Sequence, residues 1–163
     1  MQRASRLGLL SGIVVLCLGP LVAVPASAQP GPNAIPEQVV QKLIELGLRN
    51  IHRAICDGFN QCTPATEDEI KNPPISVDQA RVAIFVGTRS AFAGWCGFNA
   101  DKRSVLPLLR QLRQGKQFNE RQLALMAVIH GIQQNITAEQ LKAKGGACDE
   151  EMRKRLDTQL PKA

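Results

Sequence analysis

The residues of this sequence best suited to chemistry are its cysteines, beginning with Cys96 in the stretch FAGWCGFN, residues 92–99. Trp95-Cys96-Gly97 matches the start of a thioredoxin active site, where a thiolate is the nucleophile. That motif needs a second cysteine three residues later, and this chain has Asn99 there. A reactive thiolate is also favoured at the start of a helix, whereas the apolar pattern places Cys96 at a helix end. The sequence therefore predicts that Cys96 is a structural half-cystine.

Disulfide bonding is the expected role of the four cysteines that follow residue 28. They are Cys56, Cys62, Cys96 and Cys148. An even number of cysteines in an exported chain favours two disulfides, although the number alone allows three pairings. If consecutive long helices run antiparallel, Cys96 and Cys148 meet at one end of a bundle. We therefore expect the pairs Cys56–Cys62 and Cys96–Cys148. A metal site is disfavoured, because no two cysteines have the two-residue spacing of zinc ligands.

His130 is the main candidate for acid–base catalysis, but its position favours a structural role. It follows Leu123 and Met126 at helical spacing, which is typical of a hydrogen-bonded core histidine. An enzyme that uses His130 with Glu120 or Arg121 is an alternative. The chain has no phosphate-binding loop, serine-nucleophile motif or zinc-protease motif. We therefore expect a non-enzymatic protein with no cofactor and no metal.

Basic residues crowd the region from 102 to 121, and four of them could form an anion-binding surface: Lys102, Arg103, Arg110 and Arg113. A solvated helix face is the simpler interpretation. The functional interpretation is contact with phospholipid headgroups, lipopolysaccharide phosphates or an acidic partner protein. Nucleic acid is not an expected partner, because the chain has no tyrosine and few aromatic residues on which bases could stack.

The N-terminus predicts export. A basic start with Arg3 and Arg6 precedes an apolar run to about Val24, and Ala26-Ser27-Ala28 is a small-x-small cleavage site. Residues 1–28 are expected to be a signal peptide, with an uncleaved membrane anchor as the alternative. Cleavage would leave 135 of the 163 residues, with 18 Lys and Arg against 14 Asp and Glu. We expect a periplasmic or secreted location and no transmembrane segment after cleavage.

Apolar residues recur at helical spacing through most of the remaining chain. Residues 29–35 are expected to be a flexible leader, followed by a single helical domain over 36–160. Helices are expected at about 36–56, 76–97, 104–115, 119–134, 137–145 and 148–160, with a loop containing one short turn over 60–74. The fold class is all-α, a compact bundle of five or six helices stapled by two disulfides.

Capping boxes mark three of these helix starts, because Ser76, Asn119 and Thr137 are each followed by a glutamine three residues later. Gly87 lies in the middle of the second expected helix. Glycine there costs about 1 kcal/mol relative to alanine unless a neighbouring helix approaches closely. The sequence alone leaves open whether Gly87 carries this cost or marks a close helix contact.

The segment from Trp95 to Gln134 contains the runs CGFNADKRSVLPLLRQLR and NERQLALMAVIHGIQQ. Its CG turn and ERQxAL…HG helix resemble a family of small exported bacterial helical proteins of unknown function. The resemblance implies an envelope location and a helical fold, and it brings no catalytic residues.

The sequence as a whole favours a non-enzymatic exported protein that binds another cell-envelope component, either an envelope protein or an anionic envelope surface. An envelope stress or chaperone-like protein is the alternative, and an enzyme using His130 is a second alternative.

Overall fold

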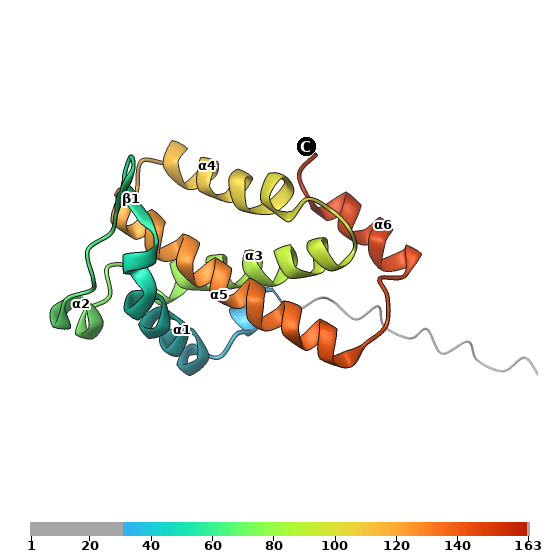
Figure 1. The fold of residues 1–163 in the computed structure, drawn as a ribbon, viewed down its shortest axis with the longest axis horizontal. Coiled ribbons are helices and arrows are strands. Elements are labelled where there is room, and N and C mark those ends of the chain that lie inside the picture. The colour runs from blue at the N-terminus through green and yellow to red at the C-terminus, as the bar shows by residue number, and fades with distance from the viewer. Residues whose placement is uncertain (1–30, 163) are drawn as a thin grey trace, which may run out of the picture.

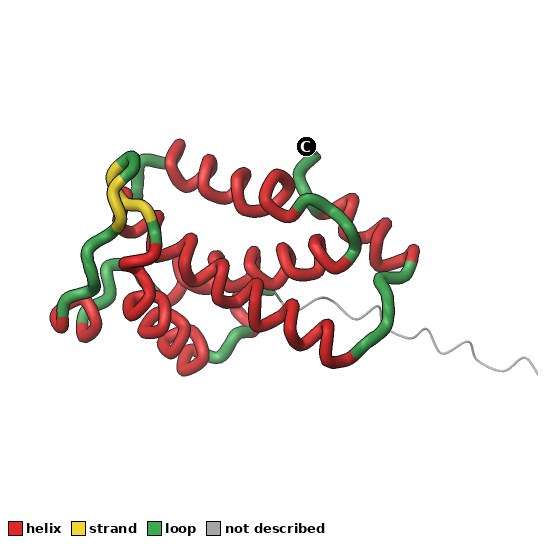
Figure 2. Tube along the Cα trace, viewed as in Figure 1, coloured by secondary structure: helices red, strands yellow, loops and turns green. Residues whose placement is uncertain are grey.

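The computed structural model describes residues 31–162, which form an all-α bundle with almost no strand (Figures 1 and 2). Its six α-helices are α1 (Glu37–Asn50), α2 (Glu67–Lys71), α3 (Val77–Trp95), α4 (Leu106–Gln114), α5 (Glu120–Lys144) and α6 (Glu150–Gln159). A short antiparallel hairpin of β1 (Ile55–Asp57) and β2 (Asn60–Gln61) connects α1 to α2. The all-α prediction is confirmed, and the expected signal peptide lies outside the described residues.

Side-chain caps begin two of the main helices where the sequence predicts them. The Ser76 hydroxyl accepts the Gln79 amide at 3.2 Å, and the Asn119 side chain accepts the Gln122 amide at 2.9 Å. Each glutamine side chain returns a bond to the cap backbone, which completes a capping box. These bonds satisfy amides that the first helical turn leaves without partners, and they fix the starts of α3 and α5.

The predicted break before Thr137 is wrong, because α5 is one continuous helix of 25 residues. Thr137 is buried in its interior, and its hydroxyl accepts a hydrogen bond from Gln133 Nε2 at 3.0 Å. The hydroxyl therefore faces a helical neighbour instead of capping a new helix. No glycine or proline interrupts the chain between Gly131 and Gly145, so the helix continues.

The first helix is shorter than the sequence predicts. It ends at Asn50, whose side chain donates to the Leu46 carbonyl at 2.8 Å, and a 3₁₀ turn, η2 (Ile51–Arg53), follows. The apolar spacing continues through Ile51 and Ile55, but Ile55 lies in β1 and is half exposed. The helix therefore stops before the disulfide-bonded hairpin begins.

The main core lies between α1, α3 and α5, with α3 and α5 forming the most extensive helix pair. Five large apolar side chains at its centre are fully buried: Val40, Leu48, Ile51, Leu125 and Ile129. A β-carbon added at Gly87 would lie 2.6 Å from the His130 carbonyl oxygen. Of the two alternatives at Gly87, the structure therefore shows the close approach, and the partner is the backbone of α5.

We expect Gly87→Ala to destabilise the protein by about 2 kcal/mol, because the added methyl group overpacks the contact with α5. Gly94, on the same helix, is the matched control, since a β-carbon there would meet nothing within 4 Å. Gly94→Ala should stabilise by about 0.5–1 kcal/mol through helix propensity alone. Urea unfolding measures both variants. Equal effects of the two substitutions would contradict the close approach.

The directions in which the helices run bring Cys96 and Cys148 together. In Figure 1, α3 runs from the hairpin end toward α6, α4 runs back, and α5 runs in the same direction as α3. The chain after α5 therefore returns to the end of α3, where Cys96 and Cys148 are bonded with Cα atoms 5.1 Å apart. Together with Cys56–Cys62, this confirms both predicted pairs. Leu156 and Leu160 pack beside Cys96 and hold α6 against α3.

Two segments at the ends of helices differ from expectation. A π-helical turn, η3 (Asp101–Val105), precedes α4, in which Leu108 is buried and Leu106 is half exposed. The end of the expected flexible leader forms a 3₁₀ turn, η1 (Pro32–Ala34), which packs on α3.

No helix within residues 31–162 has the length and apolar character needed to cross a membrane.

Candidate functional site

The hairpin between α1 and α2 carries the most exposed large apolar side chain described. Strand pairing of Asp57 with Asn60 leaves Gly58 and Phe59 as a two-residue turn. Gly58 has φ of 60°, as the first central residue of a type II′ turn requires. Phe59 follows at the tip and is 99% exposed. An aromatic side chain held fully in solvent by a tight turn is a candidate contact residue for a partner.

The base of this hairpin is fixed by the first disulfide. Cys56 and Cys62 have Cα atoms 4.9 Å apart, and both pack into the main core. The Cys62 amide also donates to the Ala54 carbonyl at 2.9 Å. The residues between the cysteines therefore form a closed loop whose two ends are buried while Phe59 is exposed. We name residues 56–62 the Phe59 loop.

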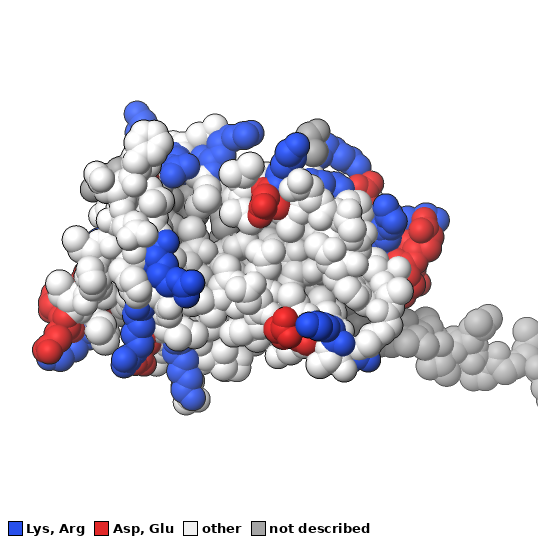
Figure 3. Space-filling view, in the orientation of Figure 1, with Lys and Arg blue, Asp and Glu red and all other residues white. Residues whose placement is uncertain are grey.

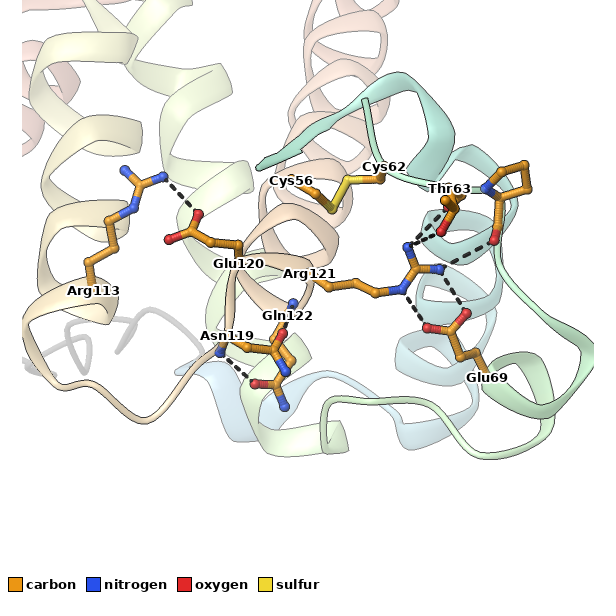
Figure 4. Close-up of a disulfide and its surroundings, with 10 residues drawn as sticks. Cys56, Cys62, Thr63, Glu69, Arg113, Asn119, Glu120, Arg121 and Gln122 are labelled. Carbon is orange, nitrogen blue, oxygen red and sulfur yellow. Dashed lines mark hydrogen bonds and ion pairs between the residues drawn. A yellow bond between two sulfur atoms is a disulfide. The ribbon is translucent and has the colours of Figure 1, made fainter. Parts of the chain in front are cut away.

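Arg121, at the start of α5, fixes the chain that leaves the Phe59 loop (Figure 4). Its guanidinium donates to Glu69 on α2 through Nε at 2.5 Å and Nη2 at 2.7 Å. Its Nη1 donates to the carbonyl and hydroxyl oxygens of Thr63 at 3.0 and 3.2 Å. The bonds from Arg121 lower the pKa of Glu69 to about 2, and the pKa of Arg121 is raised by the same partner. Both members of the Arg121–Glu69 ion pair therefore remain charged across the physiological pH range.

The structure does not bring the four predicted anion-binding residues into one surface. Arg103 is only 8% exposed, so its prediction as a surface anion ligand is wrong. It forms an ion pair with Asp157 at 2.7 Å and donates to the carbonyls of Asp157, Leu160 and Pro161 at 2.9–3.2 Å. These bonds satisfy the guanidinium and attach the C-terminal end of α6 to η3.

The other three basic residues are exposed, but they are spread along the chain. Lys102 lies in η3, about 12 Å of helix rise before Arg110 on α4. Arg113 lies 3.6 Å from Glu120, which partly neutralises it. Figure 3 shows basic side chains over the C-terminal half of α4 and beside the hairpin. Arg110 and Arg113 thus lie exposed on α4, and they do not form one surface with Lys102 and Arg103.

Cys96 is not a free thiol in this structure. It caps the C-terminal end of α3, is buried, and is bonded to Cys148. The helix dipole at this end disfavours a thiolate. The geometry therefore agrees with the structural half-cystine predicted from sequence.

His130 lies in a buried polar cluster between α3, η3 and α5. It is 2% exposed, and its Nε2 lies 2.8 Å from Ser90 Oγ, which in turn lies 2.7 Å from Ser104 Oγ. Burial lowers the pKa of His130 to about 4, against a smaller opposing effect of Asp101. Glu120, its proposed catalytic partner, lies ten residues before it on α5, about 15 Å away along the helix. The cluster has the geometry of a satisfied core network.

Sequence reasoning missed three features of these sites. The Phe59 loop has a sequence signal, since Asp57-Gly58 between two cysteines favours a turn. Ser90 and Ser104 have no sequence signal, because serine residues also occur at exposed helix positions. The partner of Arg121 is 52 residues away in sequence, so no local spacing predicts it.

Comparison of the chain with protein-family models, curated proteins and solved structures finds no match. The resemblance to exported bacterial helical proteins remains a prediction.

Proposed function

We propose that this chain is a non-enzymatic exported protein that binds another envelope protein by inserting Phe59 into an apolar pocket of that partner. The single observation that carries the proposal is a 99% exposed phenylalanine at the tip of a disulfide-closed loop. Burying an exposed phenylalanine contributes about 1.5–3 kcal/mol, and aromatic anchors of this kind dominate many interfaces.

The rigidity of the loop supports a binding role. Its ends are held by the Cys56–Cys62 bond, and the following segment is held by Arg121. A loop that is already ordered loses less conformational entropy on association.

A protein partner is favoured over a membrane surface. One exposed aromatic side chain gives weak membrane attachment, because stable attachment usually needs a larger apolar face or two anchoring signals. The two disulfides and the N-terminal sequence support an oxidising compartment outside the cytoplasm. If the protein is exported and processed, the mass of protein purified from the envelope fraction should correspond to a chain beginning at Gln29.

Site-specific photo-crosslinking tests the interaction. A benzoyl-phenylalanine at position 59 should give one discrete crosslinked protein in producing cells, and the same probe at Ile136 should not. Ile136 is the matched control, since it is an exposed apolar residue on α5 outside the loop. Excess wild-type protein should compete for the crosslink, and Phe59→Ala should compete at least about 30-fold less well.

Two results would contradict this proposal. Equal competition by Phe59→Ala would remove Phe59 from the interface. Sedimentation with phosphatidylglycerol vesicles that depends on Phe59, without a protein crosslink, would instead make the loop a lipid contact.

One observation favours the chaperone-like alternative as a second candidate. His130 is buried in uncharged form, so acid favours opening of the α3–α5 contact around it. Suppression of client aggregation at pH 4–5 but not at pH 7 would support that role. Its loss in His130→Gln would connect it to this residue.

A further inference from the structure

A cavity of about 390 Å³ lies away from the Phe59 loop, between η1, α3 and α6. Its walls are mainly apolar. Phe85 and Phe92 line it from α3, and Met152 and Leu156 line it from α6. The volume falls within the range of small-ligand sites. The Cys96–Cys148 bond fixes α6 to α3, so the two opposing walls are covalently held together.

Arg89 adds a positive charge to this apolar site. It lies on α3 between Phe85 and Phe92 and lines the cavity. Its guanidinium carbon is 5.7 Å from the centre of the Phe85 ring, and its Nη2 donates to the Gln159 carbonyl. No carboxylate within residues 31–162 forms an ion pair with it. The cavity therefore combines a long apolar wall with a cation that lacks a described counter-ion.

The hydrogen bonds of Arg89 are incomplete. Its Nε is buried and has no acceptor in the described part of the chain. A buried donor without a partner is costly, and a charged one more so. Burial also lowers the pKa of Arg89 below the ordinary arginine value. An anionic group bound beside this guanidinium would relieve both costs.

We propose that this cavity binds an amphipathic monocarboxylate of the fatty-acid type. Its carboxylate would pair with Arg89, and its acyl chain would lie between the phenylalanines of α3 and the Met152 and Leu156 side chains of α6. A carboxylate fits the planar guanidinium through paired hydrogen bonds. The chemistry of the walls favours an unbranched apolar tail, since the flexible Met152 side chain can adapt to such a chain. This site is independent of the Phe59 loop.

Calorimetric titration of the disulfide-bonded protein with decanoate and with decanol tests the proposal. Decanoate should bind more tightly than decanol, because only decanoate has a carboxylate for Arg89. Arg89→Gln should weaken decanoate binding by about tenfold or more and leave decanol binding unchanged. Arg81→Gln is the matched control. It lies on the same helix, also has a buried unpartnered Nε, and is outside the cavity. It should bind decanoate like the wild type.

A second variant locates the ligand without touching Arg89. Ala34 is exposed at the edge of the cavity in η1, so Ala34→Trp would obstruct the cavity from outside the core. It should abolish binding of both probes while circular dichroism stays unchanged. Three results would overturn the proposal: no binding of decanoate, equal affinity for decanol and decanoate in the wild type, or unchanged decanoate binding in Ala34→Trp.

Discussion

Replacing Cys96 and Cys148 together by alanine is expected to lower the free energy of unfolding by about 4 kcal/mol. The bond closes a loop with a sequence separation of 52, and without it the unfolded chain gains a large conformational entropy. It also anchors α6, whose other attachments include the Leu156 and Leu160 contacts and the hydrogen bonds from Arg89 and Arg103. We therefore expect the C-terminal helix to loosen first.

The first disulfide supplies the matched control, because Cys56 and Cys62 are separated by only six positions. Their double replacement by alanine should cost about 2 kcal/mol in the same chain-entropy treatment. Guanidinium unfolding of both double variants, with hydrogen exchange at α6, measures the difference. Equal losses would mean that native-state strain or residual structure outweighs loop length. Greater protection of α6 in the Cys96→Ala/Cys148→Ala protein would refute the anchoring role.

Acidification from pH 6.5 to 4 is expected to remove about 3 kcal/mol of stability through His130. Its folded pKa of about 4 lies below the ordinary value of 6.5. Between these values the unfolded chain binds a proton that the folded protein excludes, so stability falls as pH falls. Above about pH 7.5 this residue is almost entirely neutral in both states, and its contribution no longer depends on pH.

His130→Gln isolates this contribution. Glutamine does not titrate, and it retains a group that can bond to Ser90. The free energy of unfolding of this variant should therefore depend much less on pH between 6.5 and 4 than that of the wild type. Glu69 titrates lower, because its pKa is lowered from 4.5 to about 2, and its contribution is lost as pH falls through that range. Parallel pH curves for wild type and His130→Gln would show that other groups cause the acid sensitivity.

Most of the helical architecture could be predicted because it depends on local rules. Apolar spacing and the caps at Ser76 and Asn119 locate α3 and α5. The antiparallel assumption for consecutive helices then predicts both disulfides, because cysteine pairing follows from which helix ends meet. Where the prediction fails, a tertiary contact overrides the local signal. Thr137 has the sequence of a cap, yet it is buried within α5, where Gln133 donates both to it and to Thr88 on α3.

The functional surfaces could be predicted less well, because they depend on contacts distant in sequence. Arg103 has the same sequence character as Arg110, and only the return of the C-terminal chain buries it. The cavity beside Arg89 likewise forms only where α6 meets α3 and η1. Charge in a sequence thus identifies candidates, and burial decides which of them can meet a ligand.

The Cys96–Cys148 bond also makes residues 96–148 a covalent ring that contains α4, α5 and the connection between them. A protease that cuts this connection once opens the ring but releases no fragment, since the two pieces stay joined through sulfur. As long as no reductant breaks the disulfide, a nicked molecule would therefore keep its helices tethered to one another.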